Sequence, residues 1–289
     1  DAKKPIALLT ADAVAAEKFI GEKGAALGAK HWPGALTVVG NGEAARVPAC
    51  EWTRRLIGLA GGALRVTSAN ISGGRPATDA EESLKAAGLT ADIVVNGGVS
   101  PLGVASTVVE VADDGALKVL RPGPVAFLTL ASGSPRRAKI LRDHKVDFVV
   151  AKSDAEEVCY HDDPVKTVCE NALRKAAAFE APVLSADTIV WFNGRIYGKP
   201  ADAREAKEFL RTLSGEVHSV FTGIAFNGDV KVVESKVRFR ELTDAEIDEY
   251  VERVRPLDRA GAYDIDESGD LIVESYGGSY ENIMGLPVE

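Results

Sequence analysis

Residues 121–124 read Arg-Pro-Gly-Pro, and no other feature constrains the fold of this chain as strongly. Proline lacks a backbone donor and fixes φ, so this stretch can continue neither a helix nor a strand. It divides the 289 residues into two parts, each long enough to bury a core of its own. We therefore predict two domains, residues 1–124 and 125–289, joined by a short linker.

Both parts alternate strand-like apolar runs with helix-like stretches, which predicts an α/β fold for each. In the first part, residues 10–27 predict a helix, and a capping box at residues 78–81 predicts a second helix that ends at Gly88. The strands predicted there are residues 36–39, 64–67, 93–95, 107–111 and 117–120. The second part has predicted strands at 127–131, 146–150, 183–191, 195–197, 217–226 and 231–239, and predicted helices that begin near Pro135, Pro164, Asp202 and Thr243.

The composition is that of a globular chain, with 46% hydrophobic and 27% charged residues. A formal charge of -9 argues against a general nucleic-acid coat, so any phosphate site has to be built from a few placed Arg and Lys residues. Three cysteines, Cys50, Cys159 and Cys169, form no paired framework, and an odd count is typical of a reducing compartment. With no apolar run long enough to span a bilayer and no signal segment at the start, we expect a cytoplasmic protein without a membrane partner.

The segment 132–137, Ser-Gly-Ser-Pro-Arg-Arg, places small residues, hydroxyls and two guanidinium groups at the start of a predicted helix. Free N–H groups at a helix N-terminus carry partial positive charge, so this loop favours an anion. An ordinary capped helix with two solvated arginines is the alternative. The candidate substrate-binding residues of this loop are Ser132, Ser134, Arg136 and Arg137.

Seven motifs in the second part, taken in order, resemble those of the Maf family. They lie at residues 130–137 (Leu-Ala-Ser-Gly-Ser-Pro-Arg-Arg), 153–157 (Ser-Asp-Ala-Glu-Glu), 175–176 (Lys-Ala), 185–188 (Ser-Ala-Asp-Thr), 198–200 (Gly-Lys-Pro), 214–223 (Ser-Gly-Glu-Val-His-Ser-Val-Phe-Thr-Gly) and 258–263 (Asp-Arg-Ala-Gly-Ala-Tyr), with Gly-Leu-Pro at 285–287 near the end. The resemblance implies an elongated mixed sheet flanked by helices, as in Maf and ITPase proteins. It also implies a hydrolase that cleaves a nucleoside triphosphate between the α and β phosphates, giving a monophosphate and pyrophosphate, with Mg²⁺ or Mn²⁺ as cofactor.

Such a reaction needs cations to neutralise the polyphosphate and a carboxylate to activate water. Asp187, at the end of an apolar strand, is the first candidate for metal ligand or base, and Glu157 is the second carboxylate and metal ligand. Lys175 and Lys199 complete the catalytic set, and Thr188 and Thr222 join the substrate-binding set. Simpler readings stay open: Lys175 as a snorkelling side chain, Lys199 as a turn residue, and Glu157 as part of a solvated acidic face.

Asp266 marks a departure from the Maf pattern. Many family members read Tyr-x-Ile-Gln-Gly where this chain reads Tyr-Asp-Ile-Asp-Glu over residues 263–267. An amide both donates and accepts hydrogen bonds, whereas an ionised carboxylate only accepts. We therefore include Asp266 among the substrate-binding candidates and leave the base preference open.

The first part resembles the later motifs of YrdC-type threonylcarbamoyl-adenylate synthases. The motifs are residues 31–37 (His-Trp-Pro-Gly-Ala-Leu-Thr), 67–73 (Thr-Ser-Ala-Asn-Ile-Ser-Gly), 106–109 (Ser-Thr-Val-Val) and 120–123 (Leu-Arg-Pro-Gly). The resemblance implies a twisted mixed sheet and an ATP site lined by Ser68, Asn70, Ser106 and Arg121. The family's opening Pro-Thr-Glu-Thr-x-Tyr-Gly strand and its Lys-x-Arg motif are absent, so we expect this domain to be incomplete at its N-terminus. We expect it either to bind nucleotide or RNA weakly or to need residues that this sequence lacks.

Three functions are therefore compared. The first is the pyrophosphatase. The second is a tRNA-modification enzyme that forms threonylcarbamoyl-AMP from threonine, bicarbonate and ATP, or an RNA-binding protein, through the first domain. The third is a non-catalytic regulator of cell division. A homodimer, the metal and cooperation between the domains are left open.

Overall fold

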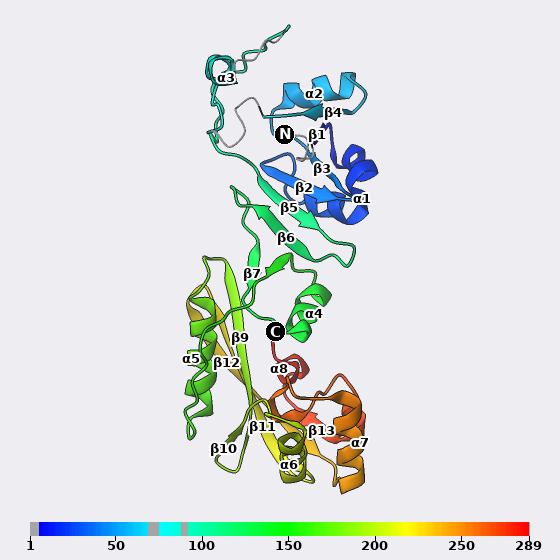
Figure 1. Ribbon diagram of the computed structural model, residues 1–289, viewed down its shortest axis with the longest axis vertical. Helices are drawn as coiled ribbons and strands as arrows, with labels where there is room; N and C mark the ends of the chain where they lie inside the picture. Colours follow the sequence, from blue (N-terminus) through cyan, green and yellow to red (C-terminus); the bar gives the residue numbers. More distant parts are fainter. Residues whose placement is uncertain (1–5, 69–74, 88–91, 289) are drawn as a thin grey trace. The chain divides into compact units, whose positions relative to one another are not determined.

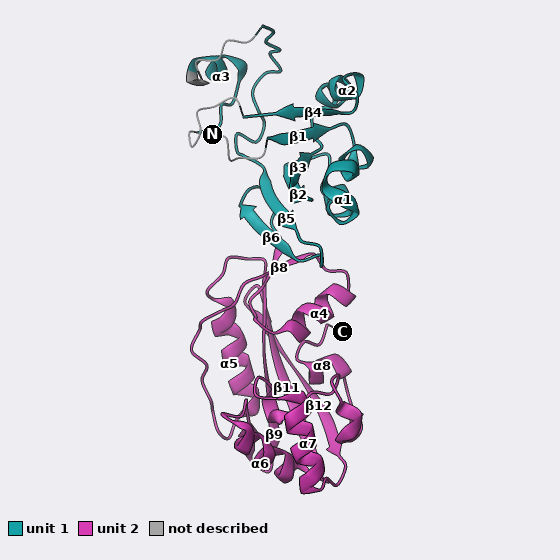
Figure 2. Ribbon diagram, turned by 45° about the vertical axis from the view of Figure 1, so that its right-hand side comes forward, with its two compact units in different colours: residues 1–127 teal, residues 128–289 magenta. Residues whose placement is uncertain are grey.

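The computed structural model describes residues 6–68, 75–87 and 92–288. Its contacts divide the chain into two compact units, residues 1–127 and 128–289 (Figure 2). The division falls three residues after the predicted boundary at 124 because the chain beyond Pro124 is still held by the first unit. The Thr107 hydroxyl donates to the Val125 carbonyl at 2.8 Å and accepts from the Val125 N–H at 2.9 Å. Among the described residues, no helix has both the length and the apolar character needed to cross a bilayer.

The first unit is a mixed sheet with helices packed against it. Its elements are β1 (Ala7–Thr10), α1 (Ala13–Ala29), β2 (Leu36–Gly40), β3 (Glu43–Arg46), α2 (Glu51–Leu59), β4 (Ala63–Val66), α3 (Ala80–Ala87), β5 (Thr107–Val111) and β6 (Leu117–Arg121). The strand order is β6-β5-β2-β3-β1-β4. Pairs β2/β5 and β1/β3 are parallel and the other pairs are antiparallel, so the predicted mixed sheet is confirmed.

Several local predictions for the first unit are wrong. The first helix begins at Ala13, not at residue 10, because Thr10 ends a strand and the Asp12 carboxylate caps the helix by accepting from the Ala15 N–H at 2.8 Å. Residues 93–95 form no strand, and Ile93 is 83% exposed. Helix α3 is capped by Asp79, one residue after the predicted cap, and its predicted end at Gly88 lies outside the described residues. Strands β1 and β3 and helix α2 were not predicted.

The second unit is an elongated mixed sheet between helices. Its elements are β7 (Leu128–Leu130), α4 (Pro135–Asp143), β8 (Phe148–Val150), α5 (Pro164–Ala176), β9 (Val183–Phe192), β10 (Arg195–Tyr197), α6 (Ala203–Leu213), β11 (Val217–Phe226), β12 (Asp229–Phe239), α7 (Asp244–Val254), two short 3-10 helices (Ala260–Ala262 and Gly269–Leu271), β13 (Val273–Gly277) and α8 (Tyr280–Met284). The order is β13-β12-β11-β9-β7-β8, and β10 pairs with β9. Helix α5 covers one face of the long strands, and α4 and α8 lie on the other (Figure 1).

Local sequence signals account for much of this unit. Asn193 and Gly194 both have positive φ, 48° and 75°, and form the predicted hairpin turn between β9 and β10. Asp202 and Thr243 cap α6 and α7 as predicted, and Thr243 forms a full capping box with Glu246. The core below α6 and α7 includes Phe209, Leu213, Phe239, Tyr250 and Val251. These contacts hold together the end of the sheet that is covered by α6 and α7. The pocket lies elsewhere, along the edge of β9 near β7.

Candidate active site

A cavity of about 740 Å³ opens along one edge of β9. Strand β7 pairs with β9 only at Val183 and Leu184, and β10 pairs with it from Val190 onward. Between these pairings, the β9 residues 187–189 line the cavity, while β11 remains paired on the other side of the strand. The short β7 therefore creates the opening, because it ends at Leu130 and the chain turns away into α4.

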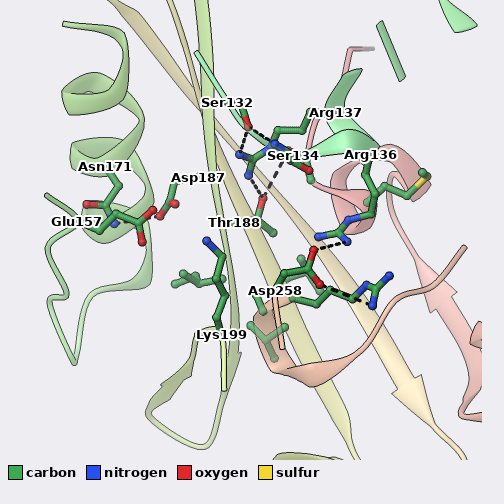
Figure 3. Close-up of a pocket in the computed structure, with 18 of the residues that line it drawn as sticks. Ser132, Ser134, Arg136, Arg137, Glu157, Asn171, Asp187, Thr188, Lys199 and Asp258 are labelled. Carbon is green, nitrogen blue, oxygen red and sulfur yellow. Dashed lines mark hydrogen bonds and ion pairs between the residues drawn. The ribbon is translucent and has the colours of Figure 1, made fainter. Parts of the chain in front are cut away.

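Neighbouring β9 residues direct their side chains to opposite faces of the sheet, as the two-residue period of a strand requires. Asp187 lies on the α5 side, near Asn171 and Glu157, whereas Thr188 lies on the side of Arg137 and Ser132 (Figure 3). Both residues line the same cavity because the sheet edge is open between them. The two predicted groups, catalytic carboxylates and helix-loop residues, are therefore brought to one pocket from opposite faces.

Lys175 links the two predicted carboxylates. Its ammonium Nζ lies 2.6 Å from Asp187 Oδ1 and 2.7 Å from Glu157 Oε1. The Lys175 and Asp187 side chains are 12% and 9% exposed, whereas the Glu157 side chain is 49% exposed. Lys175 does not snorkel away to open solvent, and its partners hold it inside the pocket.

Asn171 is a site residue that the sequence analysis missed. Its amide Nδ2 donates to Asp187 Oδ2 at 3.0 Å and to the Val158 carbonyl at 3.0 Å, and its Oδ1 accepts from the Val158 N–H at 2.8 Å. It is 3% exposed and thus fixes both Asp187 and the loop that carries Glu157. An amide on the apolar face of the predicted helix, four residues before Lys175, was the signal available in the sequence.

Neighbouring cations favour the ionised form of Glu157. Its partial burial opposes ionisation, but the hydrogen bond from Lys175 and the charges of Lys175, Lys199 and Arg137 outweigh burial and lower the pKa of Glu157 below its usual value. An ionised carboxylate at this position is suited to hold a cation.

Arg137 ties the Ser132–Ser134 loop to the rest of the pocket. Its guanidinium donates to the Gly285 carbonyl at 2.8 Å, to Ser132 Oγ at 3.1 Å and to Thr188 Oγ1 at 3.1 Å. Burial lowers the pKa of Arg137, and the charge of Asp187 works against that shift. Ser134 lies at the N-cap of α4 as predicted, but its side chain forms no capping hydrogen bond and lines the cavity instead.

Arg136 is paired within the protein. Its NH1 lies 3.3 Å from Asp264 Oδ2 and 3.6 Å from Asp258 Oδ2. Arg259 also binds Asp264 Oδ2, at 2.8 Å. Arg136 and Asp258 lie at the side of the cavity away from α5 (Figure 3), and the ion pairs compensate the charges of Arg136 and Arg259. Arg136 is therefore engaged by two carboxylates of the protein, and its role as a phosphate ligand stays a prediction.

Two predicted substrate-binding residues do not line the cavity. Thr222 is fully buried and supports Thr188 from below, with 2.9 Å between the hydroxyl oxygens. Asp266 is turned outward, where Lys139 donates to Oδ2 at 2.9 Å and the Tyr280 hydroxyl donates to Oδ1 at 3.3 Å. The turn explains this orientation, because Asp264 Oδ1 accepts from the Asp266 N–H and fixes the backbone there. Asp266 therefore lies outside the cavity lining, and its part in substrate binding stays a prediction.

Lys199 and Lys152 are the remaining cations of the pocket. Lys199 is exposed, follows β10, and points toward Asp187 (Figure 3). Lys152, which the sequence analysis missed, follows β8 and also lines the cavity. Within residues 6–68, 75–87 and 92–288, neither ammonium has a hydrogen bond or an ion pair.

The nucleotide-site candidates of the first unit are placed only in part. The Arg121 guanidinium donates to the Ser106 carbonyl at 2.8 Å and 3.0 Å and to Ser106 Oγ at 3.1 Å. Ser106 Oγ is 2.8 Å from Thr37 Oγ1. Burial and the charge of Arg121 lower the pKa of the nearby Arg46. Ser68 is exposed, and Asn70 lies outside the described residues.

Comparison with known proteins agrees with the two motif sets. The family model described as Maf-like protein matches residues 127–289, and the Sua5/YciO/YrdC model, described as telomere recombination, matches residues 1–123. The dTTP/UTP pyrophosphatase of Bacillus cytotoxicus is 44% identical over 169 residues, which cover 55% of this chain and 88% of that protein. The enzyme of the same name from Thermotoga petrophila is 43% identical over 172 residues, covering 56% of this chain and 84% of that protein.

Among solved structures, P. abyssi Sua5 in complex with L-threonine is 24% identical with a TM-score of 0.41. The match covers 55% of this chain and 48% of that one, so the chain spans about half the length of that structure. The Maf-like match covers more than half of the 289 residues, through the unit that contains the Asp187 pocket. The chain therefore belongs to the Maf family.

Proposed function

We propose that the second unit hydrolyses a nucleoside triphosphate to a nucleoside monophosphate and pyrophosphate. The observation that carries the proposal is the buried Asp187 carboxylate, held by Asn171 and Lys175 in a cavity whose lining also includes Lys152 and Lys199, which form no direct ion pair within the described part of the chain. The relatives named dTTP/UTP pyrophosphatases support pyrimidine triphosphates, dTTP and UTP, as the first substrates to test.

Each residue has a role in this proposal. Water must attack the α-phosphorus, and pyrophosphate must leave with its negative charge neutralised. Asp187 orients the attacking water and takes its proton at a carboxylate oxygen, while Asn171 and Lys175 hold that carboxylate in place. Lys199 faces the developing charge, and the Ser132–Ser134 loop with the α4 N-terminus binds phosphate oxygens.

The carboxylates fit a divalent metal. Asp187 and Glu157 already converge on one positive charge, the Lys175 ammonium, and their oxygens are the donors that Mg²⁺ and Mn²⁺ prefer. The described residues contain no group of three His, Cys, Asp or Glu side chains suited to a metal. Asp187 and Glu157 would therefore be the protein residues that hold the ion, and substrate phosphates and water would supply its other ligands. When bound, the ion would neutralise charge on the phosphate oxygens.

The test is pyrophosphate release by the full chain from common and modified nucleoside triphosphates, with Mg²⁺ or Mn²⁺. We expect turnover of at least one triphosphate, the monophosphate as second product, and its loss in Asp187→Asn. The exposed Asp229→Asn is the matched control, and it should retain activity. Absence of pyrophosphate from every triphosphate, or full activity of Asp187→Asn, would refute the proposal.

A second candidate function belongs to the first unit. The Sua5/YciO/YrdC match and the contact between Arg121, Ser106 and Thr37 support binding of ATP, with the guanidinium and hydroxyls directed at phosphate. Threonine- and bicarbonate-dependent conversion of ATP to pyrophosphate would identify the synthase activity. Because both units would then release pyrophosphate, the assay is run in Asp187→Asn, and no threonine-dependent release there would exclude this second activity.

A further inference from the structure

The charges of the cavity are unevenly compensated. Its lining includes six cations, Arg136, Arg137, Lys152, Lys175, Lys199 and Arg259, and four carboxylates, Glu157, Asp187, Asp258 and Asp264. Lys175 is paired with Asp187 and Glu157, and Arg136 and Arg259 are paired with Asp258 and Asp264. The pocket is thus net positive in a protein whose formal charge is -9.

The cations without a direct ion pair identify where a polyphosphate would bind. Arg137 donates only to neutral oxygens, and Lys152 and Lys199 form no direct ion pair among the residues that the structure describes, while the charges of Arg137 and Lys199 act on Glu157 from a distance. These three come from α4, from the loop after β8 and from the loop after β10, so they surround the open β9 edge. At the opposite end, the Arg136 and Arg259 charges are already neutralised by carboxylates, which disfavours a phosphate there.

Lys152 lies against the loop at the start of α4. A Cβ added to Gly133 would be 3.6 Å from both Cγ and Cδ of Lys152, so its aliphatic stem passes over this glycine. Gly133 stands between Ser132 and Ser134, whose backbone leads into the N-terminus of α4. The Lys152 ammonium can therefore reach an anion bound on this loop.

We propose that Lys152 binds the pyrophosphate portion of the substrate, holding the leaving group on the Ser132–Ser134 loop while Lys199 serves the α-phosphate beside Asp187. This inference rests on the proposed function and adds one substrate-binding residue to it. No covalent step is assigned to Lys152. Its contribution is electrostatic, so it should depend on charge and be screened by salt.

The test is binding of inorganic pyrophosphate with Mg²⁺ to the full chain, measured by titration calorimetry, beside steady-state kinetics with the best triphosphate. We expect Lys152→Gln to weaken pyrophosphate binding about tenfold and to raise KM by a similar factor, while kcat changes less. Lys152→Arg should recover most of the affinity. The salt dependence of pyrophosphate binding should also become shallower in Lys152→Gln.

The control is Lys231→Gln, which removes an exposed lysine on β12 outside the cavity and should leave both constants unchanged. Unchanged pyrophosphate affinity and unchanged KM in Lys152→Gln would overturn the inference, as would an equal loss in Lys152→Arg. Wild-type protein that binds pyrophosphate but hydrolyses no triphosphate would instead refute the proposed function, and the Lys152 comparison would still be read from the binding data.

Discussion

Replacement of Lys175 tests how the charges of the pocket are balanced. Lys175→Met removes the one ammonium that lies within 2.7 Å of both Asp187 and Glu157 and leaves the two carboxylates facing each other. Loss of one partner from a buried ion pair costs about 3–5 kcal/mol of stability. We expect the lower end, about 3 kcal/mol, because Asp187 keeps its hydrogen bond from Asn171 and the half-exposed Glu157 can turn to water.

Substitution of the other two residues of the cluster, Asp187 and Glu157, should reduce stability less. Asp187→Asn presents one N–H₂ and one oxygen to two donors, so one hydrogen bond is lost, and Asn171 cannot flip because its Oδ1 accepts from Val158. We expect about 1–2 kcal/mol, since Lys175 retains Glu157. Glu157→Gln should cost about 0.5 kcal/mol, as expected for a half-exposed pair.

Stability and kcat should therefore rank the three variants in different orders. Stability should fall most in Lys175→Met, whereas kcat should fall about 10²–10⁴-fold in Asp187→Asn if this carboxylate is the base. Hydrogen exchange in increasing urea, measured on peptides of α5 and β9, reports the stability of this unit separately from the first. The reasoning is refuted if Lys175→Met is as stable as the wild type, or if Glu157→Gln is as destabilising as Lys175→Met.

Two further predictions concern the scaffold. Burial lowers the pKa of His218 to about 3. Between about pH 6.5 and 3 the unfolded chain therefore binds a proton that the folded chain does not. As the pH is lowered through this range, the free energy of unfolding should decrease by at most about 1.4 kcal/mol per pH unit. Urea unfolding at a series of pH values should show a shallower dependence in His218→Phe, but not in the exposed His161→Gln. Gly223→Ala would place a Cβ 2.5 Å from the Val168 carbonyl oxygen of α5. We expect this substitution to lower the free energy of unfolding by about 1–3 kcal/mol and to abolish pyrophosphatase activity. The control is Gly277→Ala, whose Cβ would meet no described atom within 4 Å and which should change neither stability nor activity.

In the second unit, the sequence predicted those elements whose signals lie in neighbouring residues. The Asn193-Gly194 turn, the Asp202 cap and the Thr243 capping box depend on neighbouring residues, so their prediction needed no knowledge of the sheet. The same reasoning failed at residues 93–95 of the first unit. Three apolar residues there are typical of a strand, but a strand also needs a partner that local periodicity does not reveal.

The candidate site likewise has features that motifs predicted and features that depend on contacts between distant residues. Asp187, Glu157 and Lys175 were named from motifs, and the structure places the Lys175 ammonium within hydrogen-bonding distance of both carboxylates, although the chemical roles of the three remain predictions. The pairing of Arg136 with Asp264 joins residues 128 positions apart, and no spacing rule finds such a contact. Asp266 lies outside the cavity lining for a related reason: its motif fixes the position in the chain, whereas the turn made by Asp264 decides where the side chain points.

The site depends on a strand that ends early. If β7 continued beyond Leu130, it would pair with β9 alongside Asp187 and Thr188 and would close the edge along which the cavity opens. Because β7 ends there, the α4 loop and the Asp187 carboxylate, which belong to opposite faces of the sheet, can reach one ligand through the gap. The hairpin turn at Asn193-Gly194 limits the gap from the other side, since it returns β10 to pair at Val190 and delivers Lys199 just beyond it. Three features of the chain, a three-residue strand, a Pro-started helix and a tight turn, thus set the length of the site before any catalytic residue is considered.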